Sequence, residues 1–365
     1  MRQTNYVKIF SFLAFLLFGG VSCWATAESL HMLLASWPKI FCYLVAMGFF
    51  VVASIGTKLI VDSLNQKIYV EGRPGKLIGG IILVLIFWLA TSMPTNTHTF
   101  IYRNVISERV NNDVDVTMGY LEDVVKNTVN VEDCEALKAE RQAAVRTYQN
   151  LVVSEVQQPQ DPGSGPQVEK ILNEMEAKYG ENYKIRPYRS KGNIRSQQEI
   201  NTAINYYNEQ FNNLIGNIIP QYYDKNIKRP NETKLNQAAE AYEDLAALKE
   251  KIGADKKSKG ASKKKAVNLN SSEDMHDIVI PIINSGYQAV GSNSDMVRLK
   301  AGDEAKYKAD PVVTETQRMT SIFEVWGDYM AGKFNGHGFF WWILLAVLID
   351  IAAFIFFDIA FKKSY

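Results

Sequence analysis

The run FFWWILLAVLIDIAAFIFFDIAF, residues 339–361, decides the fold class of this chain. Only Asp350 and Asp358 carry charge in it, and a helix needs about 20 predominantly apolar residues to cross the hydrocarbon core of a bilayer. Three further apolar runs lie near the N-terminus, at residues 9–25, 40–61 and 77–93. The sequence therefore predicts an all-α integral membrane protein with four transmembrane helices.

The average composition hides these runs. The chain is 22% charged and 47% hydrophobic, values that soluble proteins also have. These averages combine the four apolar runs with a long hydrophilic stretch between the third and the fourth. We therefore expect three parts: residues 1–93 with three spans, an inserted hydrophilic domain at 94–336, and residues 337–365 with the last span and a short tail.

The first run has an alternative interpretation as a cleaved signal peptide. Lys8, an apolar core and then Ala25-Thr26-Ala27 fit that pattern. Gly20-Val21-Ser22-Cys23 is also a short lipobox-like sequence, which would make Cys23 a lipidated N-terminus. We favour a retained span, and the alternatives stay open at this point.

Lysines and arginines near the span ends predict the orientation, because cytoplasmic connections are enriched in them. The first connection offers a single lysine, Lys39, at its far edge. The pattern predicts cytoplasmic termini, an extracytoplasmic domain and location in the inner (plasma) membrane of a bacterium. The basic residues of the two tails and the second connection are Arg2, Lys8, Lys67, Arg73, Lys76, Lys362 and Lys363.

The inserted domain reads as a helical bundle with a coiled-coil-like stalk. Apolar residues recur at helical spacing from Thr97 to Val131, after a break expected at Met93-Pro94. Strict alternation typical of strands is nearly absent. Later helices are expected at 131–156, 167–179, from Ser196 to before Pro220, from Asn231 or Thr233 to Ile252, from Ser271 or Ser272, and from Asp310-Pro311 to Met330.

The charge of this domain argues against nucleic acid as a partner. Residues 94–336 hold 31 Lys plus Arg against 34 Asp plus Glu, a net charge of −3 from 31 minus 34. Residues 254–270 concentrate six lysines without interleaved aromatic residues. We expect a solvated, mobile loop there, with contact to an anionic surface as the alternative.

The intramembrane charges are the sharpest site candidates. Counted inward from Phe339 at 1.5 Å per residue, Asp350 lies roughly 17 Å deep, where a charged carboxyl is costly. By the same count Asp358 and Lys58 reach similar depths, so we expect an ion pair between them. The alternative is that both side chains extend separately to the cytoplasmic interface. Ser54 and Thr57 are the nearest polar candidates for Asp350 by depth. Asp350 is then a proton or cation relay, a polar contact that fixes helix assembly, or a tolerated polar residue.

No catalytic, cofactor or metal motif stands out. His31, His98 and His337 fall near predicted outer membrane surfaces without metal-ligand spacing. Cys23 and Cys42 lie at similar predicted depth, so a bridge is conceivable, although three unpaired thiols are the simpler interpretation. We therefore expect a protein that is not an enzyme and holds no cofactor or metal.

The layout of three spans, a large helical insert and a final span resembles tetraspanins, but the insert has only Cys134 where that family has paired cysteines. The chain more closely resembles bacterial four-span membrane proteins of unknown function, in which a helical insert carries a Gly-x-Gly-Pro turn. Gly163-Ser164-Gly165-Pro166 is the matching stretch. The resemblance implies the same architecture and no specific activity.

Three functional hypotheses follow, and the weakest of them is an enzyme with a site in the inserted domain. The first is a membrane scaffold or sensing component of an envelope complex, in contact with lipid and assembled as a homo-oligomer or with other proteins. The alternative is an ion- or proton-coupled channel or transducer that uses Asp350.

Overall fold

The chain forms two compact helical units in a computed structural model that describes residues 2–66, 69–158, 160, 162–190, 196–228, 231–254, 266–334 and 338–361. Unit 1 comprises Met1–Leu121, Gln237–Ser292 and Leu299–Tyr365, and unit 2 comprises Glu122–Asn236 and Asn293–Arg298. The described residues contain helices and no β-strand, which confirms the predicted all-α class.

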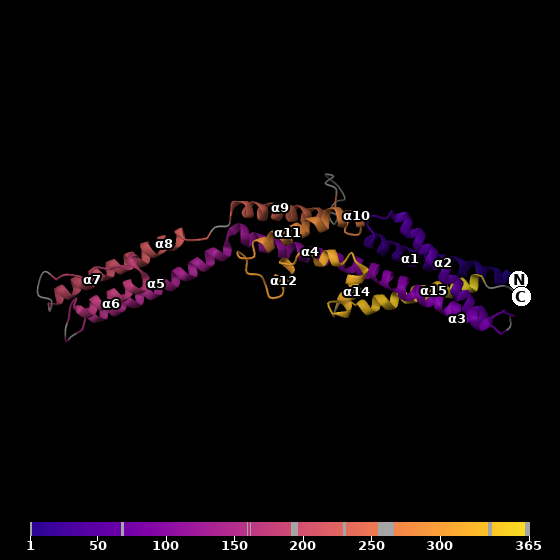
Figure 1. Cartoon of the computed structure of the whole chain (residues 1–365), viewed down its shortest axis with the longest axis horizontal. Coiled ribbons are helices and arrows are strands. Elements are labelled where there is room, and N and C mark those ends of the chain that lie inside the picture. The colour runs from indigo at the N-terminus through magenta and orange to yellow at the C-terminus, as the bar shows by residue number, and fades with distance from the viewer. Residues whose placement is uncertain are drawn as a thin grey trace. The chain divides into compact units, whose positions relative to one another are not determined.

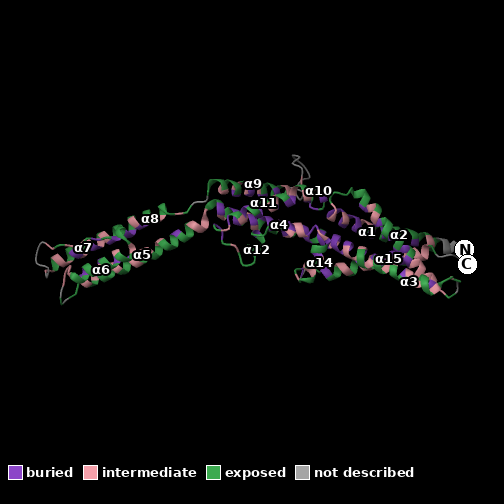
Figure 2. Ribbon diagram, in the orientation of Figure 1, coloured by how far each residue is buried: buried purple, intermediate pink, exposed green. Residues whose placement is uncertain are grey.

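Four helices among the described residues are long and apolar enough to cross a membrane. At most a third of the most apolar stretch of each helix is buried inside the chain, and Figure 2 shows exposed residues along these helices. So much exposed apolar surface requires lipid around it. The helices, seen together in Figure 1, are α1 (Arg2–Leu33), α2 (Lys39–Leu64), the continuous α3 (Arg73–Ile86), π-helical turn η1 (Phe87–Ser92) and α4 (Met93–Lys126), and α15 (Phe339–Ala360).

Proline does not end helices here as we expected. The predicted break at Met93-Pro94 and the predicted end before Pro220 were both wrong, because a π-helical turn precedes each proline. Proline lacks an N–H and its ring clashes with the carbonyl one turn back, and the wider π turn relieves that clash. The pairs are η1 with Pro94, η3 (Leu214–Ile218) with Pro220 and η4 (Met275–Val279) with Pro281.

The outer part of unit 1 packs α4 against α9 (Glu232–Ala254) and α11 (Ile280–Ser292) (Figure 1). A Cβ at Gly286 would lie 2.8 Å from Leu245 Cδ1 and 3.0 Å from Thr117 Cγ2, so the three helices meet closely at this glycine. Most of the apolar stripe predicted along the stalk is covered by its own chain, although Val125 near its end is 41% exposed. Its members Ile106, Val110, Val114 and Leu121 are all buried.

The segment from Asp310 to Met330 is not the single helix that we expected. It contains α13 (Glu315–Arg318) and α14 (Ile322–Met330), after α12 (Asp303–Tyr307). The hydroxyls of Thr314 and Ser321 cap the two later helices. Asp113 of α4 holds the start of α13, because its carboxylate accepts hydrogen bonds from the backbone N–H and the hydroxyl of Thr316 at 2.8 and 2.7 Å.

Unit 2 is a separate helical bundle of α5 (Thr128–Val156), α6 (Pro166–Tyr179), α7 (Gln197–Asn213), η3 and α8 (Ile219–Lys225). Tyr207 and Phe211 of α7 are fully buried in its core. Ser196 caps α7 as predicted, since its hydroxyl accepts from the Glu199 N–H at 3.2 Å. The predicted stalk helix to Val131 ends earlier, at Lys126, because Asn127 has a left-handed φ of 55°.

Candidate functional site

The candidate site is built around Asp350, whose side chain lies inside the bundle of spans. Asp350 is 1% exposed and belongs to α15. One carboxylate oxygen accepts from the Ser22 hydroxyl of α1 at 2.6 Å, and the other accepts from the Ser92 hydroxyl in η1. One carboxyl thus joins three helices that are far apart in the sequence.

Asn96 supplies the next layer of hydrogen bonds. Its amide nitrogen donates to both serine oxygens, at 3.0 Å to Ser22 and 2.9 Å to Ser92. Its amide oxygen accepts from the Thr26 hydroxyl at 2.9 Å. In each of these hydrogen bonds, the donated proton points along the network toward Asp350. The polar side chains of the three helices thus form one connected hydrogen-bond network that ends on the carboxylate.

The register between helices differs from the one that depth counting suggested. Asp350 lies level with Ser22 and Ser92, close to the outer ends of the predicted first and third spans. Depth counted from Phe339 failed because α15 begins farther out than its neighbours: Trp342 packs against Phe100, seven residues beyond the predicted third span. Residue counts within each run do not show where one helix starts relative to another.

Ser54 is not a partner of Asp350, contrary to our expectation from depth. The Ser54 hydroxyl donates to the carbonyl of Phe50 in its own helix at 2.9 Å, and Thr57 does the same with Ala53 at 3.0 Å. Such bonds to the preceding turn satisfy a hydroxyl in an apolar helix without any partner from another helix.

A layer of aromatic rings lies directly inward of the polar site. Phe354 follows Asp350 by one helical turn and packs on Phe50 and Phe87 with ring centroids 5.5 and 5.9 Å apart. All three rings are buried. Phe15 adds a fourth ring, 5.9 Å from Phe50. The layer separates Asp350 from the inner charged residues.

Lys58 and Asp358, for which we expected an ion pair, lie 3.5 Å apart. Lys58 is also 2.9 Å from Asp62, four residues later in α2. The lysine is thus shared between a carboxylate of its own helix and one of α15. This charged group is distinct from the hydrogen-bond network of Asp350.

A second group of buried polar side chains, around His98, lies beyond this network, toward the helices outside the spans. His98 is fully buried; its Nε2 lies 3.0 Å from the carbonyl oxygen of Met319 and its Nδ1 lies 2.7 Å from the Ser29 hydroxyl. A carbonyl can only accept, so Nε2 carries the proton and the neutral ring accepts from Ser29. Glu28 is buried beside them and pairs with Lys39 at 2.6 Å and Arg103 at 3.6 Å.

Small residues bring α2 and α3 close together. A Cβ on Gly80 would lie 2.7 Å from the carbonyl oxygen of Gly56, and one on Gly56 would lie 2.9 Å from Leu83 Cβ. The neighbouring Gly79 has open space instead. The three cysteines are free, so Cys23 and Cys42 are not bridged.

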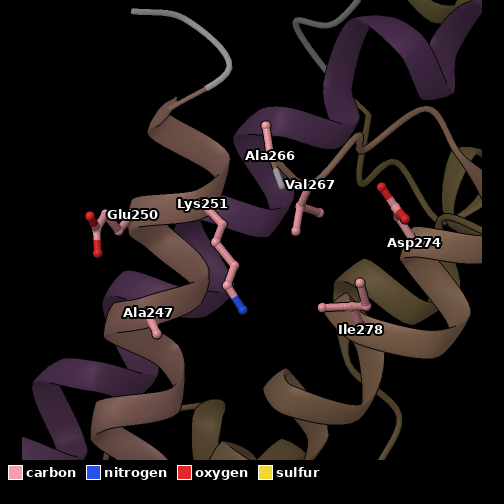
Figure 3. Close-up of a pocket in the computed structure, with 7 residues that line it drawn as sticks. All are labelled: Ala247, Glu250, Lys251, Ala266, Val267, Asp274 and Ile278. Atoms are coloured by element: carbon pink, nitrogen blue, oxygen red, sulfur yellow. The ribbon is translucent and has the colours of Figure 1, made fainter. Parts of the chain in front are cut away.

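A surface pocket of about 320 Å³ lies at the end of α9 (Figure 3). Figure 3 shows the Lys251 side chain reaching into the space opposite Ile278, while Glu250 points away. The walls also include Ala266 and Val267. Residues 255–265, which make up most of the lysine-rich segment that we singled out, lie outside the described residues.

Asp350 was predicted as a site residue from the sequence, but its hydrogen-bond partners Ser22, Ser92 and Asn96 were not. A signal was present: the stretch TSMPTNTHT, residues 91–99, is polar although it follows an apolar run directly. Ser22, Thr26 and Ser29 recur at steps of four and three, which places them on one face of α1. Two polar faces of this kind in adjacent spans suit interhelical hydrogen bonds.

Within the described ranges, no group of three or more His, Cys, Asp or Glu is arranged to hold a metal ion. His337, which we considered with His31 and His98 at the outer mouth, lies outside those ranges. No family model, no curated protein and no solved structure matches this chain.

Proposed function

We propose that this multi-span membrane protein is a non-enzymatic scaffold or sensing component of an envelope assembly. The observation that carries the proposal is the hydrogen-bonded core around Asp350, in which Ser22 and Ser92 each donate to one oxygen of the carboxylate. A satisfied polar contact that joins three helices fixes one arrangement of the spans. The aromatic layer next to it fills the interior of the bundle of spans, which suits a structural role.

The same core couples the spans to the helices outside them. The outer elements hold the end of α1, because the Ser272 hydroxyl donates to the carbonyl of His31 at 3.0 Å and His276 Nε2 lies 3.1 Å from that of Met32. Ser22, in the same helix, binds Asp350. A force or ligand on the outer helices therefore reaches the membrane core through a continuous helix.

In this proposal both termini are cytoplasmic, and unit 2 and the outer part of unit 1 are extracytoplasmic, in the inner membrane of a bacterium. A membrane-impermeant maleimide tests the orientation. Thr202→Cys, an exposed site in unit 2, should react in intact cells, whereas Glu71→Cys in the second connection should react only after lysis. The opposite labelling pattern would overturn the orientation.

Assembly with itself or with other proteins is the second part of the proposal. Most of the stalk stripe is buried within the chain, so contacts with partners must mainly use other surfaces. Val131, Leu137 and Leu151 of α5 are large apolar residues that stay exposed. Native electrophoresis of the gently extracted protein should give a mass above the monomer; a clean monomer without co-purifying protein would refute assembly.

A second candidate function, proton or cation coupling at Asp350, is favoured by the orientation of the donors toward the carboxylate. Asp350→Asn should then abolish an ion-dependent activity without changing expression or folding. The aromatic layer opposes this candidate, since the buried rings of Phe50, Phe87 and Phe354 lie between Asp350 and the Lys58–Asp358 pair. Intact function in both Asp350→Asn and Asp350→Leu would eliminate it.

A further inference from the structure

An apolar groove of about 530 Å³ lies between α1, α2, the η1–α4 junction and α14. Its volume falls within the range of about 300–1,000 Å³ that is usual for ligand sites. From the spans it is lined by Leu30, Phe49, Leu89 and Ala90, and from α14 by Ile322 and Phe323. No charged residue lines it.

The hydrogen-bond donors at the border of the groove are already used inside the protein. Thr91 donates to the carbonyl of Phe87 at 2.5 Å, Thr95 to that of Thr91 at 2.7 Å, and Thr26 to Asn96 Oδ1 at 2.9 Å. The Trp326 indole N–H donates to the carbonyl of Pro94 at 3.2 Å. A ligand that presents hydrogen-bond acceptors therefore finds no free donor among these lining groups.

The groove opens onto the lipid-facing surface of the spans. Phe49 belongs to the second span and is 44% exposed, and Leu89 belongs to the third and is 63% exposed. Phe323 of α14, 76% exposed, forms the outer rim. Lipid chains that surround the spans can thus enter the groove sideways, without crossing a polar surface.

We infer that this groove binds an acyl chain of a membrane phospholipid, with α14 closing over it from the outer side. A hydrocarbon chain asks for no hydrogen bond, whereas a peptide in the same place would leave its backbone groups without partners. The inference does not depend on the scaffold proposal. Since Thr26 and Thr95 line the groove and also belong to the Asp350 network, a bound chain would contact the side chains that hold the spans together.

Native mass spectrometry tests this inference on the full chain. The protein is reconstituted into palmitoyl-oleoyl phosphatidylcholine nanodiscs, extracted in mild detergent and activated until detergent is stripped. We expect one retained phosphatidylcholine per chain in the wild type and at least a several-fold smaller lipid-bound fraction in Ala90→Phe, which fills the groove. Ile82→Phe, at a lipid-facing position outside the groove, should retain lipid like the wild type.

A second pair of variants guards against misfolding of Ala90→Phe. Phe323→Ser at the exposed rim should also lower retention, whereas Phe340→Ser, exposed on α15 and outside the groove, should not. Lack of any retained lipid in the wild type would overturn the inference. So would equal retention in all variants, or a retained polypeptide or second chain in place of lipid. Oligomeric mass, read in the same spectra, reports separately on the scaffold proposal.

Discussion

Replacing Asp350 by alanine removes the acceptor that the Ser22 and Ser92 hydroxyls share. Hydrogen bonds between transmembrane helices contribute about 0.6 kcal/mol on average and up to about 1.7 kcal/mol, so about 1 kcal/mol is a middle value for each bond. Loss of two bonds therefore costs about 2 kcal/mol. For a unit of a few hundred residues, that corresponds to a fall in melting temperature of about 4–8 °C.

The assay is thermal unfolding of the detergent-solubilised protein, followed by tryptophan fluorescence. Leu348→Ala is the matched control, because Leu348 lies on the same helix but is 51% exposed toward lipid. Asp350→Asn should melt between Asp350→Ala and the wild type, because an amide keeps one oxygen acceptor and adds an N–H donor.

The reasoning is refuted if Asp350→Ala melts within about 1 °C of Leu348→Ala, since the polar core would then add nothing to stability. A rise in melting temperature would also refute it. That result would mean that burial of the carboxylate costs more than its hydrogen bonds return.

Three further predictions use other contacts. Gly80→Ala should destabilise the α2–α3 pair by about 1–3 kcal/mol in chemical unfolding, because the added Cβ meets the Gly56 backbone. Gly79→Ala, at the neighbouring position with open space, should be neutral or stabilising. Equal effects of the two substitutions would contradict the close contact. Asp113→Ala should lower the free energy of unfolding by about 3 kcal/mol, since the carboxylate accepts one hydrogen bond from Tyr287 and two from Thr316. Limited proteolysis should then show faster cleavage around α13. Unchanged digestion would contradict the prediction. Burial alone would raise the pKa of Asp328, but hydrogen bonds from Arg318 and Lys333 outweigh it and hold the pKa below its ordinary value. The stability from this cluster is therefore present above about pH 4 and lost as pH falls through the lowered pKa, so the difference in unfolding free energy between wild type and Asp328→Asn should shrink at low pH; a constant difference would contradict the assignment.

Local patterns in the sequence predicted several elements well. Ser196 was identified as an N-cap because a hydroxyl followed by Glu199 three residues later satisfies the first N–H groups of a helix. Prolines misled the same reasoning. The clash at Pro94 and Pro220 is real, but a π turn absorbs it, and no local signal distinguishes a π turn from a helix end.

For the candidate site, Asp350 was predictable and its partners were not. A carboxyl inside an apolar run is visible in the sequence because its cost does not depend on neighbours. Whether Ser54 or Ser22 meets it depends on the register between helices. That register is set by packing, as where Phe354 stacks on Phe50 and Trp342 meets Phe100.

The sequence by itself determined that the chain is helical, that four runs can span a membrane, and that a carboxyl lies among them, since length, hydropathy and period are properties of single segments. Only the tertiary structure decided that Asp350 binds Ser22 and Ser92, that most of the stalk stripe is covered by its own chain, and that a groove opens beneath α14. Each of these depends on how one helix is shifted along another, and a shift changes contacts between segments while it leaves the pattern of each segment unchanged.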